Sequence, residues 1–232
     1  MPTTTDWEFL LDEDAVLRGQ GADPTIIRGR SPRLVQMAGK ALEEGRPLLQ
    51  PQVFFNQYEV KTLRHERVTF AGGGFLGGSL IAEHLGPAQQ VIILVCTIGT
   101  AIDDLIAEVT KKDMVYALAL DGVGSAAVEA LANEACRRLE VEAAQDGFQA
   151  SIPLSPGMVG WPVDEGQSQI FSLIGGEPIG VDLNEHYLMT PRKSLSMILG
   201  LGPDMGYKGK VCDFCAMRDT CRYQDHYDPT SA

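Results

Sequence analysis

Apolar residues recur along the chain with two different periods, which predict helices early and strands after them. In residues 31–45 the apolar positions are three or four apart, as on one face of a helix. These positions are Leu34, Val35, Ala38 and Leu42. Ser31 stands where a capping side chain is expected, and Gly45 ends the pattern. From Gln52 to Phe70, aromatic and β-branched residues favour one or two antiparallel strands.

The central part of the chain alternates between helical and strand patterns. The expected elements are a short helix over 76–85, a strand buried on both faces over 90–98 and a helix around 100–109. A long alanine-rich helix is predicted from about Asp113 to Val141, with interruptions at Gly122 and Gly124 as an open alternative. Its small residues would let other backbones approach closely.

The last ninety residues are rich in short strand patterns. The expected elements are a strand near 148–153, a Pro/Gly turn at 155–162, a helix near 164–174 and strands over 179–189 and 193–201. Because strands outnumber clean βαβ units, the predicted class is α+β, a central twisted, mainly antiparallel sheet covered by helices. We expect this domain to span residues 1–204 and a small Cys-rich metal-binding segment to span 205–232.

Composition and net charge limit the classes of partner that this chain can be expected to bind. The 232 residues are 44% hydrophobic, which is enough for a core. The longest apolar run, 91–98, is far shorter than the roughly 20 residues of a membrane span, and the N-terminus does not resemble a signal peptide, so a cytoplasmic protein is expected. With 31 acidic and 19 basic residues the net charge is −12, which disfavours nucleic acid and membrane surfaces as partners.

The segment Gly72-Gly73-Gly74-Phe75-Leu76-Gly77 fits the GxGxxG pattern of dinucleotide sites. Such a site also needs an acidic residue about 20 positions later, at the end of the next strand. That strand reads QVIILVCTIG and contains none. A tightly packed glycine-rich turn is therefore favoured over a cofactor site.

Three of the five cysteines crowd near the C-terminus. In Cys212-x2-Cys215-x5-Cys221, two thiolates on one turn and a third nearby can share one metal ion. His226 would complete a zinc site, whereas the thiolates alone could hold an iron–sulfur cluster whose last ligand comes from elsewhere. Zinc is slightly favoured because the chain supplies all four ligands, and three free thiols are the remaining alternative. An odd cysteine count suits a reducing compartment better than a disulfide framework.

Three blocks carry a family resemblance: ALALDGVGSAAVEALANEACRRL at 117–139, SPGMVGWP at 155–162 and EHYLMTP at 185–191. Together they resemble the reactivation domain of cobalamin-dependent methionine synthase, in its stand-alone form, over roughly residues 20–205. The resemblance implies an α+β domain that binds S-adenosylmethionine in a shallow groove on the sheet. It also implies docking on a corrinoid-carrying partner, a methionine synthase or another corrinoid protein.

The function that the resemblance implies is reductive methylation of a partner's cobalamin. Cobalt oxidised to the +2 state takes one electron from a flavodoxin- or ferredoxin-type donor and a methyl group from S-adenosylmethionine. A basic patch around Arg192, Lys193, Lys208 and Lys210 is one candidate place for the donor, and the chain's own metal centre is another. Two rivals stay open: electron delivery through a C-terminal iron–sulfur cluster, and a non-enzymatic docking module for a corrinoid domain.

The cofactor residues follow from the same resemblance. They are Glu129, Pro156, Gly157, Met158, Glu185, Met189 and Pro191. The arginine and tyrosine of the family's motif are here Pro153 and Met158, so the cofactor carboxylate is held by Arg192 or Lys193, or binding is weak or absent. Alternation over 183–190 predicts a strand that floors the groove, in which His186 is a hydrogen-bonded sheet residue rather than a base.

Overall fold

The computed structural model describes residues 3–206 and 209–220. Its main sheet has the order β4-β3-β2-β5-β9-β6, β1 pairs with β2, and every described strand pairing is antiparallel. The strands of the main sheet are β1 (Thr3–Thr4), β2 (Gln52–Arg64), β3 (Arg67–Phe70), β4 (Phe75–Gly77), β5 (Gln90–Thr97), β6 (Gln149–Ala150) and β9 (Ser194–Gly202). The α+β prediction is confirmed.

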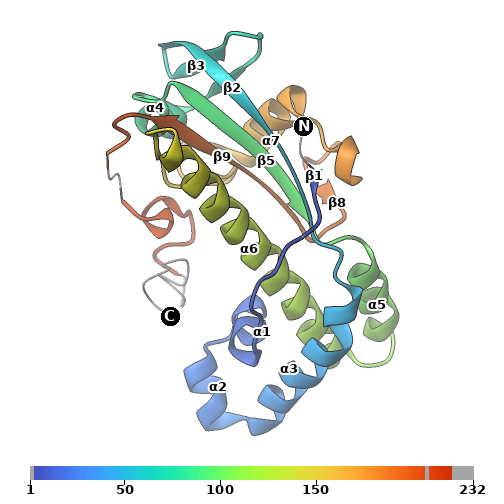
Figure 1. The fold of residues 1–232 in the computed structure, drawn as a ribbon. Coiled ribbons are helices and arrows are strands. Elements are labelled where there is room, and N and C mark those ends of the chain that lie inside the picture. Colours follow the sequence, from blue (N-terminus) through green and yellow to red (C-terminus); the bar gives the residue numbers. More distant parts are fainter. Residues whose placement is uncertain (1–2, 207–208, 221–232) are drawn as a thin grey trace.

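Helices cover both faces of this sheet and form one end of the molecule (Figure 1). They are α1 (Glu13–Gly19), α2 (Pro24–Arg30), α3 (Pro32–Gly45), α4 (Ser79–Leu85), α5 (Ala101–Thr110), α6 (Met114–Gln145) and α7 (Val163–Leu173). Short 3₁₀ helices lie at η1 (Arg46–Leu48), η2 (Glu177–Ile179) and η3 (Val211–Phe214). In Figure 1, α6 runs along the sheet and continues beyond it to pack with α1 and α3, and α2 packs in turn on α3.

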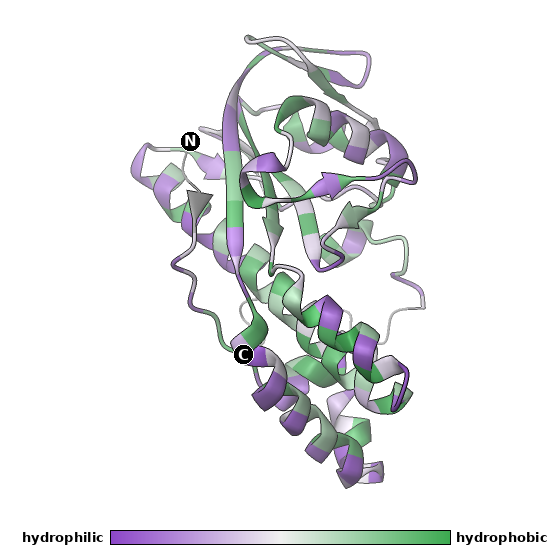
Figure 2. Cartoon of the chain, turned by 90° about the vertical axis from the view of Figure 1, so that its right-hand side faces the viewer, coloured by the Kyte–Doolittle hydropathy of each residue, from purple (hydrophilic) through white to green (hydrophobic). Residues whose placement is uncertain are grey.

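The sheet separates two hydrophobic cores. Alternate residues of β5 point to opposite sides, so Ile92 and Leu94 join the core under α6, while Val91 and Ile93 join the core under α4 and α7. We call these the α6 core and the α7 core. Because both faces of β5 are buried, its sequence is apolar at nearly every position rather than at alternate ones. Figure 2 shows the green apolar stretches along the central strands.

Helix α6 is continuous, so an interruption at its glycines is wrong. A Cβ on Gly122 would lie 2.6 Å from the carbonyl oxygen of Val16 in α1, and one on Gly124 would lie 3.0 Å from Lys193 Cε. Gly122 is therefore required for the close approach of α1, and Gly124 leaves room for the Lys193 side chain. The helix itself is stabilised by its burial against the sheet.

The same helix is long and apolar enough, by length and composition, to cross a membrane. It is the one such helix in the part of the chain that the structure describes. Of its most apolar 18-residue window, 61% is buried inside the molecule, which is what a core helix requires.

The predicted strand over 179–189 is wrong, because the segment folds into a separate small hairpin of β7 (Asp182–Leu183) and β8 (Met189–Thr190). The Asn184 side chain accepts hydrogen bonds from the N–H groups of His186 (2.9 Å) and Leu188 (3.0 Å), which closes the turn. The His186 side chain is 75% exposed, so it is not a sheet histidine.

Smaller departures concern element boundaries. Ser31 occupies the N-cap position of α3 but makes no capping hydrogen bond with its side chain. Residues 75–77 form β4, so the predicted helix over 76–85 begins only at Ser79. The glycine-rich segment is the turn of the β3–β4 hairpin, with positive φ at Gly73 and Gly74. A hairpin turn does not present a helix N-terminus to a pyrophosphate in the way a βαβ unit does.

Candidate functional site

The turn at residues 155–161, which we call the PG turn, is held in shape by its own backbone. The N–H of Gly157 donates to the Trp161 carbonyl at 2.8 Å, and the N–H of Trp161 donates to the Met158 carbonyl at 2.9 Å. Gly157 has φ +100°, a conformation that favours glycine. The Trp161 side chain is fully buried, and its Nε1 donates to Gln169 Oε1 at 3.2 Å. The turn is therefore anchored to α7 by one large aromatic residue.

Pro156 is positioned by a close approach to α7. A Cβ on Gly166 would lie 2.8 Å from Pro156 Cβ and 3.0 Å from Trp161 Cε2. The absence of a side chain at Gly166 lets the proline and tryptophan rings sit directly on the helix. Sequence reasoning found the turn but gave Gly166 no role.

The C-terminal segment packs against the PG turn. The N–H of Val159 donates to the carbonyl of Phe214 at 2.9 Å, and Met158 forms an antiparallel bridge with Cys215. The Phe214 ring packs edge-on against His84 of α4, with ring centroids 4.5 Å apart. The predicted cofactor turn and the predicted metal-binding pair are thus neighbours, which their separation in sequence does not reveal.

Cys212 lies in η3 and Cys215 is the C-cap residue that follows it, and both are half-buried. The N–H of Cys215 donates to the Cys212 carbonyl at 3.3 Å, and Cys215 Sγ accepts a hydrogen bond from the N–H of Met217 at 3.4 Å. Within residues 3–206 and 209–220, no three His, Cys, Asp or Glu residues come together as a metal site. Cys221 and His226 lie outside the described residues, so the metal stays a prediction.

Glu129 is half-buried on α6, on the face it shares with Asp121 and Ser125. Those two residues accept hydrogen bonds from Lys193 Nζ at 2.7 Å and 3.0 Å, and the Lys193 side chain is only 12% exposed. Lys193 is therefore committed to this ion pair and cannot also grip a cofactor carboxylate.

Arg192 is the remaining candidate for that carboxylate. It is exposed, its backbone N–H donates to Asp103 Oδ2 at 3.0 Å, and its guanidinium makes no hydrogen bond or ion pair with any residue that the structure describes. Of the predicted basic patch, Lys193 is neutralised by its ion pair with Asp121. Lys208 lies outside the described residues. Arg192 and Lys210 are the exposed members of the patch among the described residues, and the patch stays a prediction.

The other predicted cofactor residues do not come together at one place. Met158 and Met189 both pack, partly buried, against the α7 core, and Pro191 is buried in the bend that precedes β9. Glu185 lies in the β7–β8 turn with its side chain 87% exposed, so it does not lie on the floor of the sheet. Glu129 belongs to α6, which covers the opposite face of the sheet.

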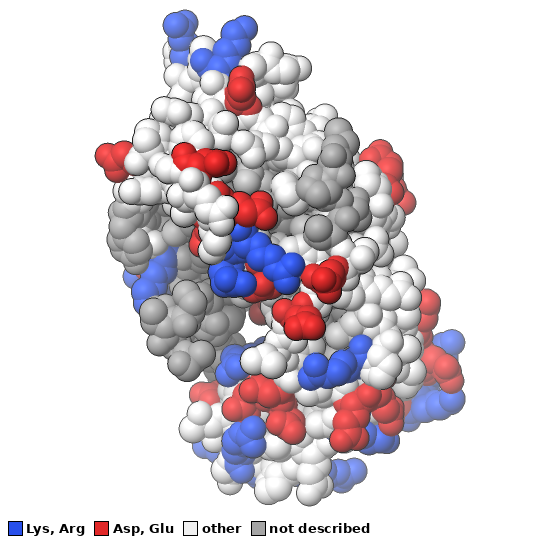
Figure 3. Space-filling view, viewed as in Figure 1, with Lys and Arg blue, Asp and Glu red and all other residues white. Residues whose placement is uncertain are grey.

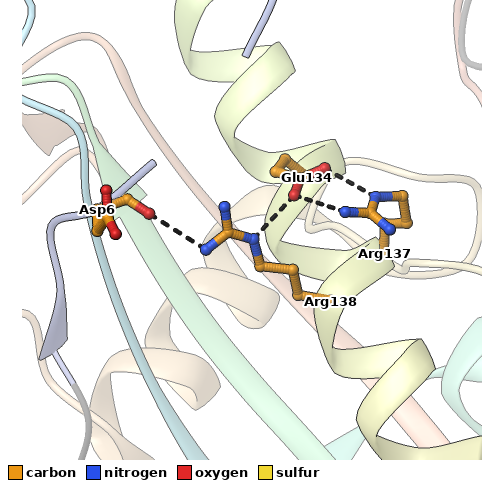
Figure 4. Close-up of polar contacts among 4 residues, drawn as sticks. All are labelled: Asp6, Glu134, Arg137 and Arg138. Atoms are coloured by element: carbon orange, nitrogen blue, oxygen red, sulfur yellow. Dashed lines mark hydrogen bonds and ion pairs between the residues drawn. The ribbon is translucent and has the colours of Figure 1, made fainter. Parts of the chain in front are cut away.

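Sequence reasoning missed a charged cluster that fastens the N-terminal segment to α6 (Figure 4). Glu134 accepts hydrogen bonds from Arg137 (2.7 and 2.8 Å) and Arg138 (2.8 Å), and Arg138 also donates to the carbonyl of Asp6. The Arg138 guanidinium stacks over Trp7 at 4.3 Å. Hydrogen bonds from Arg137 and then Arg138 lower the pKa of Glu134 to about 2. The spacing of three and four residues on one helix was the available signal.

Figure 3 shows basic groups interspersed with acidic groups on the face drawn. The remaining cysteines are core residues: burial raises the pKa of the Cys96 thiol to about 12, and burial also raises the pKa of Cys136. Neither is a reactive thiol at neutral pH.

No protein-family model and no curated protein matches this sequence. Among solved structures, the fold is similar to one described as the crystal structure of the MetH reactivation domain bound to AdoHcy. The TM-score is 0.60 at 16% sequence identity, over 80% of this chain and 71% of that one. The likeness shows a related α+β fold.

Proposed function

We propose that this protein supports reductive methylation of an oxidised corrinoid cofactor on a partner protein, with S-adenosylmethionine as methyl donor. The observation that carries the proposal is the fold likeness to a reactivation domain that binds AdoHcy, the demethylated form of that donor. The anchored PG turn, at the position expected from the sequence, supports it.

The chemistry asks little of the protein beyond alignment. The partner's reduced cobalt is the nucleophile, the methyl–sulfur bond breaks, and its electron pair leaves with sulfur as a neutral thioether. No proton is transferred, so a general acid or base is not needed. The protein's contribution is to hold the methyl group in line with the metal.

Two places are candidates for the donor. The PG turn offers backbone N–H and C=O groups to the amino-acid and adenine parts. Glu129, the carboxylate that the resemblance implies for the positively charged sulfonium, lies on α6, which covers the opposite face of the sheet, so the Glu129→Ala variant decides between the two places. Arg192, whose guanidinium makes no hydrogen bond or ion pair with any described residue, would replace the arginine that the chain lacks at Pro153.

Calorimetric titration of S-adenosylmethionine and its demethylated product into anaerobically purified protein tests the proposal. Weak saturable binding is expected, because Pro153 removes one bidentate contact. The Glu129→Ala variant should lose a further ~1–3 kcal/mol of binding free energy, as expected for a charge-assisted contact. Glu142→Ala, an exposed residue on the same helix, is the matched control and should bind like the wild type. Absence of binding in the wild type would contradict the proposal.

A second candidate function is electron delivery to the corrinoid partner by an iron–sulfur cluster of the chain's own. The contact between Cys215 and the PG turn favours it, because it would place the cluster beside the methyl-transfer site. Metal analysis of anaerobic protein distinguishes the cases: several irons with matching sulfide would support electron delivery, and one zinc would exclude it. A docking module without chemistry would bind the corrinoid domain but not S-adenosylmethionine.

A further inference from the structure

The end of the main sheet formed by β3, β4 and the last residues of β2 has one covered face and one open face. Val68 and Leu76 are fully buried in the α7 core. No apolar residue between 60 and 77 belongs to the α6 core, so the side chains that alternate with the buried ones face away from both cores. These side chains, which we call the tip face, are Thr62, Arg64, Arg67, Thr69 and Phe75.

Two arginines stand directly opposite each other on the tip face. Arg64 and Arg67 are cross-strand partners, and the two residues of the turn between them, His65 and Glu66, both have positive φ. Like charges in directly opposite positions destabilise a sheet, and positive φ at residues other than glycine adds backbone strain. Neither guanidinium makes an ion pair or hydrogen bond with any residue that the structure describes. The arrangement opposes folding within the chain, and a negatively charged partner would relieve it.

The Phe75 ring adds an apolar contact surface beside this charge. The Arg67 guanidinium lies over the ring, 4.0 Å from its centroid, yet 37% of the phenylalanine stays exposed. The hydroxyls of Thr62 and Thr69 share a hydrogen bond of 2.9 Å, so they satisfy each other. Arginine and aromatic side chains are enriched in protein–protein interfaces, and stacking orients a guanidinium for a carboxylate. The tip face therefore has the composition of an interface.

The distribution of charge indicates which class of anionic partner fits. Residues 60–77 contain three basic residues and one acidic residue, whereas the whole chain has a net charge of −12. In Figure 3 basic side chains stand at the top of the molecule, the end at which Figure 1 shows β3. A long polyanion or a membrane would also meet the acidic remainder of the surface, which repels it. A protein whose carboxylates are confined to one patch would meet only the basic tip.

We propose that the tip face is a docking surface for a protein partner that presents a compact group of carboxylates beside an apolar residue. The carboxylates accept hydrogen bonds from Arg64 and Arg67, in place of the ion pairs that the chain itself does not supply. The apolar residue packs on the exposed part of Phe75. This docking does not depend on the binding of S-adenosylmethionine, so it is tested separately from the proposed function.

Fluorescence anisotropy of two labelled acidic peptides tests the surface on the full-length protein. Each peptide has eight glutamates, with two central leucines in one and two central serines in the other. At about 0.1 M salt the Debye length is about 10 Å, so remote acidic residues are screened while the tip face is not. Both peptides should bind, the leucine peptide by about threefold more tightly, because it buries apolar surface on Phe75. Phe75→Ala should remove this difference. Absence of binding, or equal binding of both peptides to the wild type, overturns the proposal.

A charge reversal separates docking from a structural role of the arginine pair. Arg64→Glu places a carboxylate opposite Arg67, so it should raise the midpoint of urea unfolding while weakening both peptides by about tenfold or more. Arg64→Thr should weaken binding without lowering the midpoint, because threonine favours strands. Lys111→Glu, at the exposed C-cap of α5, changes the net charge equally and should leave peptide binding unchanged. A lower midpoint in Arg64→Glu, or an equal loss of binding in Lys111→Glu, contradicts the proposal.

Competition identifies the source of the negative charge. An oligothymidylate of forty nucleotides and vesicles containing phosphatidylglycerol present extended phosphate charge instead of a compact group of carboxylates. At matched total charge, neither should displace the leucine peptide, because both also meet the acidic remainder of the chain. Displacement by either one would assign the tip face to nucleic acid or to a membrane and overturn its assignment to an acidic protein.

Discussion

Glu134 shows how a single residue of this chain can connect stability to pH. Its carboxylate is bound by two arginines of its own helix, while Arg138 reaches on to the N-terminal segment at Asp6 and Trp7. The arginine side chains are 62% and 39% exposed, so solvent screens the interaction. The main consequence is a titration shift with a predictable sign.

We expect Glu134→Gln to destabilise the protein at neutral pH by about 1 kcal/mol after allowance for screening. The folded-state pKa of Glu134 is about 2, below the unfolded value of about 4.3. The carboxylate therefore stabilises the fold above the unfolded pKa, and this contribution is lost as pH falls through the folded pKa. Denaturant unfolding of both proteins between pH 7 and pH 2 should show the difference shrinking below pH 5. A constant difference would contradict it.

At this scale the sequence predicted which residue types could bind a cofactor, but not which of them already have partners within the fold. The residues of the PG turn were identified from the motif, and the structure shows how they are anchored. Lys193 was equally eligible as a carboxylate ligand until the structure showed its pairing with Asp121. Nothing in the local sequence around Lys193 indicates which α6 side chain lies opposite it.

Among the elements, α6 was predicted well because its pattern is long, and β7–β8 poorly because its pattern is short. Apolar–polar alternation over 183–190 fits an extended strand, but the Asn184 side chain captures two N–H groups and closes a turn instead. Hydrogen bonds from one side chain to the nearby backbone thus outweigh the apolar–polar alternation over 183–190. In α6 the opposite holds, since burial of one face outweighs the poor helix propensity of two glycines.

The α1–α6 crossing yields a test at the element scale. Gly122→Ala should destabilise the protein by about 1–3 kcal/mol, because the new methyl group would meet the Val16 carbonyl oxygen and force the helices apart. Gly39→Ala in α3 is the control: its Cβ would lie 3.5 Å from Glu13 side-chain atoms, an ordinary contact, and helix propensity should make it neutral or stabilising by up to about 1 kcal/mol. Thermal unfolding measures both. Equal effects would show that α6 and α1 are not in tight contact there.

For the molecule as a whole, the sequence predicted the layers but not the arrangement of the C-terminal segment. An apolar strand flanked by helical patterns implies a sheet covered on both sides, which β5 confirms. The seating of Phe214 on His84 joins residues 130 positions apart through one ring contact, and no periodicity encodes such a pairing. Since one aromatic ring makes this contact, truncation of the chain before Phe214 tests the predicted boundary after residue 204.

We expect a chain ending at Gly206 to fold cooperatively without the Cys-rich segment. It keeps Met205, which is 2% exposed and packs in the α7 core. A Cβ on Gly200 would lie 3.0 Å from Met205 Cε, so the strand is shaped around this side chain. Loss of the half-buried Phe214 should lower the free energy of unfolding by about 1–1.5 kcal/mol, roughly half of the value for a fully buried side chain of this size.

A chain ending at Asp204 should be weaker still, by about 2–5 kcal/mol, because it also removes a core methionine and leaves a cavity beside Gly200. Urea unfolding of the full chain and both truncations, at matched metal content, measures the series. Similar m-values with successively lower midpoints are the expected result, since the same cooperative unit unfolds each time. If the chain ending at Gly206 failed to fold, the Cys-rich segment would be part of the domain core rather than an addition to it.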